Sequence, residues 1–261
     1  MKYKTIFITF LFIISSLLSF AQNNSINQVD DKGYKQGLWQ KYYQNGKIQY
    51  EGHFKNNKPV GELKRYSNDG VLKVILNYKE NSDKINAKFY HPGKIIQAEG
   101  IYIGQSKDSI WNYYTAEGFL INKVPYVNDI KSGVEEKFYQ NGNLYEKTVW
   151  EEGIKDGLVL KYYDSGKVMM RILYSYGRFD GEYNVYGPDE KILIQGQYKN
   201  NKREGAWKYY KDNGHIENEI NYINGVAENQ EELEKLENEY IEMLENNKGK
   251  FKEPTEEDIF K

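Results

Sequence analysis

The stretch Gly37-Leu-Trp-Gln-Lys-Tyr-Tyr-Gln-Asn-Gly46 decides the fold of this chain, because it recurs almost unchanged as Gly205-Ala-Trp-Lys-Tyr-Tyr-Lys-Asp-Asn-Gly214. Its aromatic residues are typical of a β-strand. Its Asn-Gly ending favours a type I′ turn, in which both central residues take a positive φ. A second short strand follows at about Ile48–Lys55. The stretch therefore predicts a β-hairpin.

The same pattern runs through most of the chain and divides it into eight units. They begin 23 to 25 residues apart, at Gly37, Gly61, Lys84, Ser109, Gly133, Gly157, Gly181 and Gly205. The position five residues into each unit is always aromatic: Tyr42, Tyr66, Phe89, Tyr114, Phe138, Tyr162, Tyr186 and Tyr210. The position nine residues in is Gly in every unit except the seventh, which has Glu190. An internal repeat of this length indicates an array of small, similar structural elements.

The repeat predicts an all-β fold. Each unit is a hairpin, and a looser turn such as Asn56-Asn57-Lys58-Pro59 joins it to the next. One hairpin is marginally stable in water, so the units must stack on one another. We expect an elongated antiparallel sheet of about eight hairpins over residues 33–226, with sixteen strands spanning roughly 75 Å at ~4.8 Å per strand.

Two units depart from the pattern. The third has Lys84 in place of the first Gly, and Ile101 where the other units have an aromatic residue. The seventh reads Gly187-Pro188-Asp189-Glu190 at its turn. We expect a bend or a bulge in the sheet at these two places.

The quoted repeats, with linking turns such as Lys55-Asn-Asn-Lys-Pro-Val-Gly61 and Lys199-Asn-Asn-Lys-Arg-Glu-Gly205, resemble the bacterial variant of the MORN repeat. The resemblance covers about residues 33–226. It implies an extended, twisted antiparallel sheet without catalytic residues. It also implies a scaffold or binding module, with protein or lipid partners. Proteins of this kind are often named as antitoxins of toxin–antitoxin systems.

The composition excludes several classes of site. The 261 residues contain no Cys, which removes disulfides, thiolate metal sites and a Cys nucleophile. The three His are far apart, and neither a Gly-rich phosphate loop nor a nucleophile motif occurs. The formal net charge is −2, which does not favour nucleic acid. We therefore expect no enzymatic activity, no cofactor, no metal and no nucleic-acid partner.

The first 21 residues have the features of a secretory signal peptide. Lys2 and Lys4 precede an apolar run over 6–20, and Ser19-Phe20-Ala21 places small residues at a cleavage site. The alternative is a membrane anchor, but the run is shorter than the ~20 residues that span a bilayer. We expect export to the periplasm, the cell surface or the medium, with a leader over 22–32.

The C-terminal region differs from the repeats. Residues 227–261 hold 12 acidic and 5 basic residues, a net charge of −7. Apolar side chains recur at helical spacing, which predicts an acidic amphipathic helix over 227–248 followed by a flexible tail over 249–261. The apolar face consists of Leu233, Leu236, Tyr240, Met243 and Leu244. This helix either caps the last hairpin or docks a partner.

Basic and tyrosine side chains recur beside the aromatic position, where they would form two parallel rows. This candidate binding surface comprises Lys41, Tyr43, Arg65, Lys88, Tyr90, Lys137, Tyr139, Lys161 and Tyr163. Such rows would suit an anionic protein, glycan or lipid headgroup. The alternative is that Tyr and Lys simply cover a sheet that has no second layer.

These observations predict an exported, non-enzymatic repeat protein that binds a protein or a component of the cell envelope. One alternative is an antitoxin or immunity protein that neutralises a toxin. Another is a surface module that binds glycan or lipid.

Overall fold

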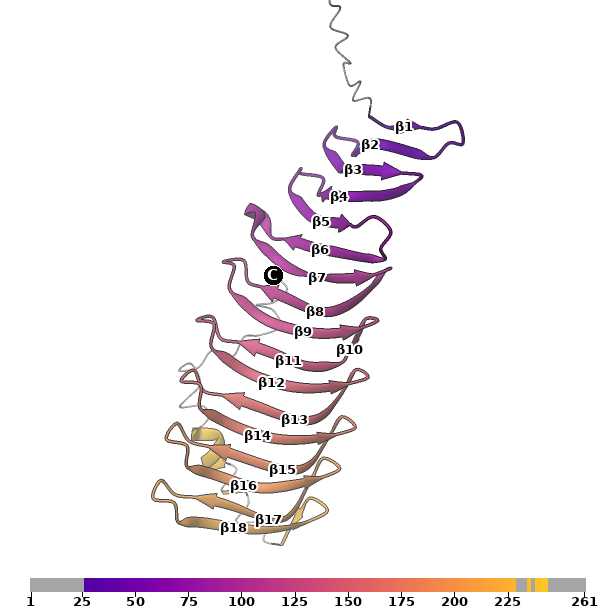
Figure 1. Ribbon diagram of the computed structural model, residues 1–261. Coiled ribbons are helices and arrows are strands. Elements are labelled where there is room, and N and C mark those ends of the chain that lie inside the picture. Colours follow the sequence, from indigo (N-terminus) through magenta and orange to yellow (C-terminus); the bar gives the residue numbers. More distant parts are fainter. Residues whose placement is uncertain (1–25, 229–233, 236–237, 244–261) are drawn as a thin grey trace, which may run out of the picture.

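The computed structural model describes residues 26–228, 234–235 and 238–243. Within these residues the chain forms one open, elongated antiparallel sheet of 19 strands (Figure 1). Each long strand pairs with the long strand before it and the one after it along the chain. The predicted all-β repeat architecture is therefore confirmed. The proposed signal peptide and tail lie outside the described residues.

Eight long hairpins build the array, as the repeat predicts. They are β2 (Lys35–Tyr42) with β3 (Ile48–Lys55), β4 (Lys58–Tyr66) with β5 (Leu72–Tyr78), β6 (Lys84–Tyr90) with β7 (Ile96–Ile103), β8 (Ser106–Tyr114) with β9 (Leu120–Val127), β11 (Gly133–Phe138) with β12 (Leu144–Glu151), β13 (Ile154–Tyr162) with β14 (Val168–Ser175), β15 (Arg178–Tyr186) with β16 (Ile192–Lys199), and β17 (Lys202–Tyr210) with β18 (Ile216–Ile223). Three short strands and one 3-10 turn complete the sheet region: β1 (Gln28–Val29), β10 (Ile130–Lys131), β19 (Val226–Ala227) and η1 (Pro92–Lys94).

The two kinds of turn are the reverse of those predicted. The Asn-Gly turn is a three-residue loop in which the Gly46 N–H donates to the Tyr43 carbonyl at 3.0 Å, and Gly46 takes a positive φ while Asn45 does not. The type I′ prediction at Asn45-Gly46 is therefore wrong. The linking turn is the tight one, because Asn56 and Asn57 have φ values of 51° and 65° between paired Lys55 and Lys58.

The strand pairing reveals a more regular repeat than the sequence alignment does. Tyr90 pairs with Ile96 just as Tyr42 pairs with Ile48. The third unit therefore begins at Ile85, not at Lys84, and all eight units are spaced by 24 residues. The aromatic residue that seemed displaced in this unit, Tyr102, pairs with Ile85 in the regular position.

One cross-strand row of side chains forms the core of the array. We call it the core ladder, and the face that carries it the inner face. Its members are Trp39, Gly52, Leu63, Leu76, Ala87, Gly100, Trp111, Val124, Glu135, Thr148, Val159, Ile172, Tyr183, Gly196, Trp207 and Ile220. Large members sit against small ones, and a Cβ added to Gly100 or Gly196 would lie 2.4 Å from the indole of Trp111 or Trp207.

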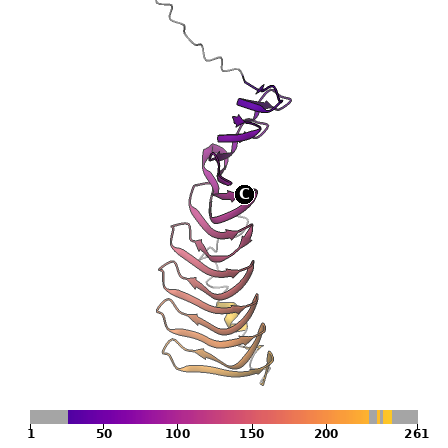
Figure 2. The same ribbon diagram turned by 45° about the vertical axis from the view of Figure 1, so that its right-hand side comes forward.

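Glycines at the start of the units bend the hairpins around this core. Between β12 and β13, Thr148 pairs with Val159 and Trp150 with Lys155, so β13 carries two extra residues there. Gly157 lies in this bulge with φ at 114°, a conformation that favours glycine. The hairpins from β8 onward consequently curve into deep arcs, and the inner face is concave (Figure 2).

The bend or bulge expected at the third unit is not found at the strand pair that enters it, so this prediction is wrong. The pairing of β5 with β6 runs without a register shift, and Tyr78 pairs directly with Ile85. The bulge that bends the other junctions is therefore missing here. The seventh unit differs from its prediction, because Glu190 adopts φ of 68° and keeps the same turn as the glycines.

A short helix near the C-terminus packs on the inner face. Residues 234–235 and 238–243 are helical, and Tyr240 packs against the hydrophobic cluster around Trp207 and Tyr222 (Figure 2). The predicted helical start at Ala227 is wrong, since Ala227 belongs to β19. Leu233, Leu236 and Leu244 lie outside the described residues, and Met243 is exposed. In the described part of the chain, no helix is long and apolar enough to span a membrane.

Candidate binding surface on the concave face

A row of basic side chains lies over the aromatic rings of the inner face. We call it the cationic row, and it consists of Lys35, Lys107, Lys131, Lys155 and Arg203. Each residue stands two positions before the start of a unit. The Lys35 Nζ lies 4.5 Å from the Trp39 ring centroid, and the Lys107 Nζ lies 4.8 Å from that of Trp111. At these distances the cations are attracted to the negative ring faces.

The predicted basic row is divided between two environments. Lys41 and Arg65 project from the inner face and are exposed. Lys137 and Lys161 lie on the same face, but both approach the buried carboxylate of Glu146, at 3.3 Å and 3.8 Å. Only the first two therefore present free charge.

The predicted tyrosine row joins neighbouring hairpins. The Tyr43 hydroxyl donates to the Tyr66 carbonyl at 2.8 Å, and those of Tyr139 and Tyr163 donate to the carbonyls of Tyr162 and Tyr186, each at 2.7 Å. His91 occupies the same position in the third hairpin, with its Nε2 3.1 Å from the Tyr114 carbonyl. This row stabilises the stacking of the units.

Lys88 and Tyr90 do not belong to either row. The corrected register places Lys88 one position before the basic row and Tyr90 at the regular aromatic position. Because side chains alternate between the two faces of a strand, both residues lie on the outer face. Lys88 is 3.5 Å from Glu99 there. The candidate surface taken from the sequence therefore mixes two faces at this hairpin.

Glu135 is a buried carboxylate in the core ladder. It accepts hydrogen bonds from Asn122 Nδ2 at 2.9 Å, Lys131 Nζ at 3.1 Å and Trp150 Nε1 at 2.7 Å. Burial alone would raise the pKa of Glu135, but the hydrogen bond from Asn122 and the charge of Lys131 outweigh it and hold that pKa below its ordinary value. Glu135 is thus an ionised, fully paired part of the core.

The free positive charge of the inner face lies mainly over the first four hairpins. Lys35, Lys41, Arg65 and Lys107 form no ion pair with any residue that the structure describes. The helix that carries Tyr240 covers the other end of this face, at β15 to β18. This part of the inner face, which the described part of the helix leaves open, is rich in aromatic rings and carries positive charge, and it therefore suits an anionic partner.

Metal binding finds no support in the described residues. They contain no group of three His, Asp or Glu side chains that could hold an ion. The MORN repeat is likewise a non-catalytic binding repeat.

The family comparison matches five of the eight hairpins. The model described as "MORN repeat variant" matches residues 35–56, 59–80, 131–152, 155–176 and 203–224. The chain therefore contains MORN repeats. The MORN model does not match the third, fourth and seventh hairpins, and each of these lacks a glycine that the other units have. In place of these glycines the third hairpin has Ile85 and Lys94, the fourth has Ser109, and the seventh has Glu190. The strand pairing is nevertheless that of the other hairpins.

Other comparisons add little to this assignment. No curated protein matches the chain. Among solved structures, the chain is similar to part of a Tc holotoxin pore of Photorhabdus luminescens, with 13% identity and a TM-score of 0.18. The match covers 69% of this chain and 12% of that one, and a likeness of this size carries no argument.

Sequence reasoning missed the cationic row because its residues were assigned to linking turns. The signal was present, since Lys107, Lys131, Lys155 and Arg203 are spaced by multiples of 24 residues. Trp111 and Trp207 are core residues of the array, each of which is 1% exposed.

Proposed function

We propose that this protein is an exported, non-enzymatic scaffold that binds an acidic segment of a partner protein along the inner face of its first four hairpins. MORN repeats are generally protein- or membrane-binding modules. The observation that carries the proposal is the cationic row above the rings of Trp39 and Trp111, on the part of the inner face that the described part of the C-terminal helix leaves open.

Electrostatic complementarity supports an acidic partner over a neutral one. Lys35 and Lys107 hold their charge against ring faces, and Lys41 and Arg65 add charge at the exposed rim. A charged rim mainly increases the rate of association, whereas cations held on rings contribute to affinity. Binding should therefore weaken as the salt concentration rises.

The test is a cross-linking pull-down with tagged protein beginning at Gln22, from envelope and secreted fractions. We expect one dominant protein, with at least tenfold lower recovery for the double variant Lys35→Gln/Lys107→Gln. The matched control, Lys64→Gln/Lys123→Gln, changes two lysines of the outer face and should recover the partner normally. Equal loss in both variants would contradict the assignment to the inner face.

Export has a separate test. The signal-like segment predicts that the mature protein begins at Gln22. Expression of the full chain, followed by fractionation and N-terminal sequencing, should recover this shortened form outside the cytoplasm. Recovery of the uncleaved chain in the cytoplasm would reject export.

A further inference from the structure

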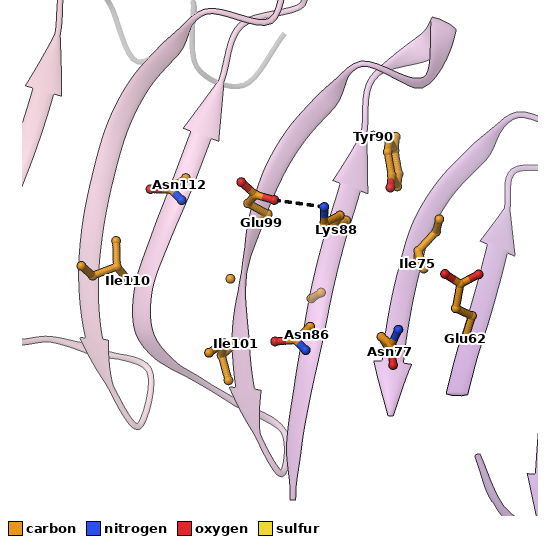
Figure 3. A pocket seen from close by; sticks show the side chains of 12 residues that line it. Glu62, Ile75, Asn77, Asn86, Lys88, Tyr90, Glu99, Ile101, Ile110 and Asn112 are labelled. Atoms are coloured by element: carbon orange, nitrogen blue, oxygen red, sulfur yellow. Dashed lines mark ion pairs between the residues drawn. The ribbon is translucent and has the colours of Figure 1, made fainter. Parts of the chain in front are cut away.

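A groove lies on the outer face at the junction of the second and third hairpins. It measures about 570 Å³ and is lined by strands β4 to β8 (Figure 3). The pairing of the strands arranges its side chains in two straight rows. One row is Glu62, Asn77, Asn86 and Ile101, and the other is Ile75, Lys88, Glu99 and Asn112.

The groove follows from the missing bulge between β5 and β6. Elsewhere, extra residues at the start of a unit interrupt the rows, as Gly157 does where its backbone lies against Val149. Between β5 and β6, Asn77 and Asn86 are instead direct cross-strand partners. The departure of the third unit from the repeat thus leaves the side-chain rows of the groove uninterrupted across β5 and β6.

The lining is rich in hydrogen-bonding groups that have no partner among the described residues. The side chains of Asn77 and Asn86 are exposed and make no hydrogen bond there. The Oδ1 atom of Asn112 is buried and unpartnered within the described structure. A buried polar atom without a hydrogen bond costs about 1–3 kcal/mol, so a rotation of the Asn112 amide that brings Oδ1 to a donor of the ligand removes this cost and adds to affinity.

The charge and the backbone of the groove exclude two classes of ligand. Glu62 and Glu99 outnumber Lys88, so the lining does not attract anions. Strands β4 to β8 are paired along both edges, which leaves no free edge for a peptide to add as a strand. The remaining lining combines amide and carboxylate groups with the branched apolar side chains of Ile75, Ile101 and Ile110.

We propose that this groove binds a linear oligosaccharide. Sugar hydroxyls both donate and accept hydrogen bonds, which matches side-chain amides that do the same. The apolar C–H faces of the sugar rings lie on the isoleucines, and the ring of Tyr90 stands beside Lys88 and Ile75 at one side of the groove (Figure 3). Each row crosses four strands, a span of ~14 Å at ~4.8 Å per strand, which accommodates a short chain of sugars.

The experiment uses protein beginning at Gln22 on an array of linear neutral, amino and acidic oligosaccharides, followed by calorimetry with the best-bound one. We expect binding to at least one neutral or amino oligosaccharide, weakened at least tenfold by Asn77→Ala/Asn86→Ala. The control Gln197→Ala changes the residue that corresponds to Asn77 in the seventh hairpin and should bind normally. Binding to no oligosaccharide, or equal weakening by the control, would overturn the proposal.

A second variant separates binding from folding. Because the Oδ1 of Asn112 is unpartnered, Asn112→Leu should leave the urea midpoint unchanged or raise it, yet weaken sugar binding at least fivefold. Unweakened binding by this variant would also overturn the proposal. Lys35→Gln/Lys107→Gln, which tests the protein-binding inner face, should bind sugar normally, so the two proposals can fail separately.

Discussion

The fourth and fifth hairpins fill the same position of the core ladder in opposite ways. The fourth places Trp111 over the bare backbone of Gly100, with the indole N–H donating to the Ile101 carbonyl at 3.1 Å. The fifth places Glu135 there, held by Asn122, Lys131 and Trp150. Both side chains are nearly inaccessible, at 1% and 4% exposure.

The difference shows that the backbone fixes where this side chain lies, but not whether the side chain is apolar or charged. A buried indole contributes through the apolar area that it removes from water. A buried carboxylate contributes nothing of that kind, and it is tolerated only when donors satisfy it. The repeat can therefore keep its shape while one hairpin contains a charged network that its neighbour lacks.

The largest effect is expected for Trp111→Ala. Loss of a fully buried indole should lower the free energy of unfolding by about 3–5 kcal/mol, because Gly100 leaves nothing to fill the cavity. Urea unfolding followed by circular dichroism measures this loss. Trp39→Ala, at the partly exposed first position, is the matched control and should cost clearly less. Equal losses of unfolding free energy in the two variants would show that burial does not decide how much each position of the core ladder contributes to stability.

Glu135→Ala should come second, at about 2–4 kcal/mol, because it leaves the charge of Lys131 and two neutral donors without their acceptor. Glu135→Gln keeps the shape of the side chain and loses its charge, so it should lower the free energy of unfolding by less.

The lowered pKa of Glu135 adds a pH test. Its contribution is complete above the unfolded value of ~4.3 and is lost as the pH falls through the lower folded pKa. The difference between wild type and Glu135→Gln should therefore shrink between pH 7 and pH 3, and a constant difference would contradict an ionised Glu135.

Gly100→Ala should destabilise the fourth hairpin by about 1–3 kcal/mol, since the new methyl group would overlap the indole. Hydrogen exchange should show the loss of protection centred on β7 and β8. Gly104→Ala, whose added Cβ meets nothing within 4 Å, controls for glycine replacement as such. Alanine at Gly104 is itself destabilising, because Gly104 has a positive φ. The deciding measurement is therefore the hydrogen-exchange protection of the amides around the Trp111 ring, and not the free energy of unfolding of the whole protein.

The sequence predicts the repeat but not its fine register, and particular residues show why. Gly at fixed spacing and an aromatic residue between them identify all eight hairpins. Phe89 and Tyr90 are both aromatic, so the sequence alone aligns the third unit one residue too early. The strand pairing shows that Tyr90, not Phe89, occupies the regular aromatic position. Asn-Gly and Asn-Asn both accept a positive φ, so composition does not separate a two-residue loop from a three-residue one.

The candidate site is less predictable because it depends on which residues meet across strands. The groove of Asn77 and Asn86 arises from a bulge that is absent, and no motif marks an absence of this kind. Glu135 lies beside Glu136 in the sequence, but the two point to opposite faces, and only the pairing shows that Glu135 meets Lys131 and Asn122. With Trp150, side chains from four strands, β9 to β12, define that network.

The smallest effect is expected for Lys107→Gln, which removes the cation above Trp111 while keeping much of the side chain's packing. A partly exposed cation–π contact contributes about 0.5–1 kcal/mol, and the Lys107 Nζ also donates to the Tyr113 hydroxyl at 3.0 Å, so the fourth hairpin should lose at least that amount in urea unfolding. In the fifth hairpin, Lys131→Gln removes a cation that both lies 4.5 Å from the Trp150 ring centroid and bonds to Glu135, and it should cost more. If the two losses are equal, the carboxylate gives Lys131 no additional role, and the charged network of the fifth hairpin is no stronger than the ring contact that the fourth hairpin already has.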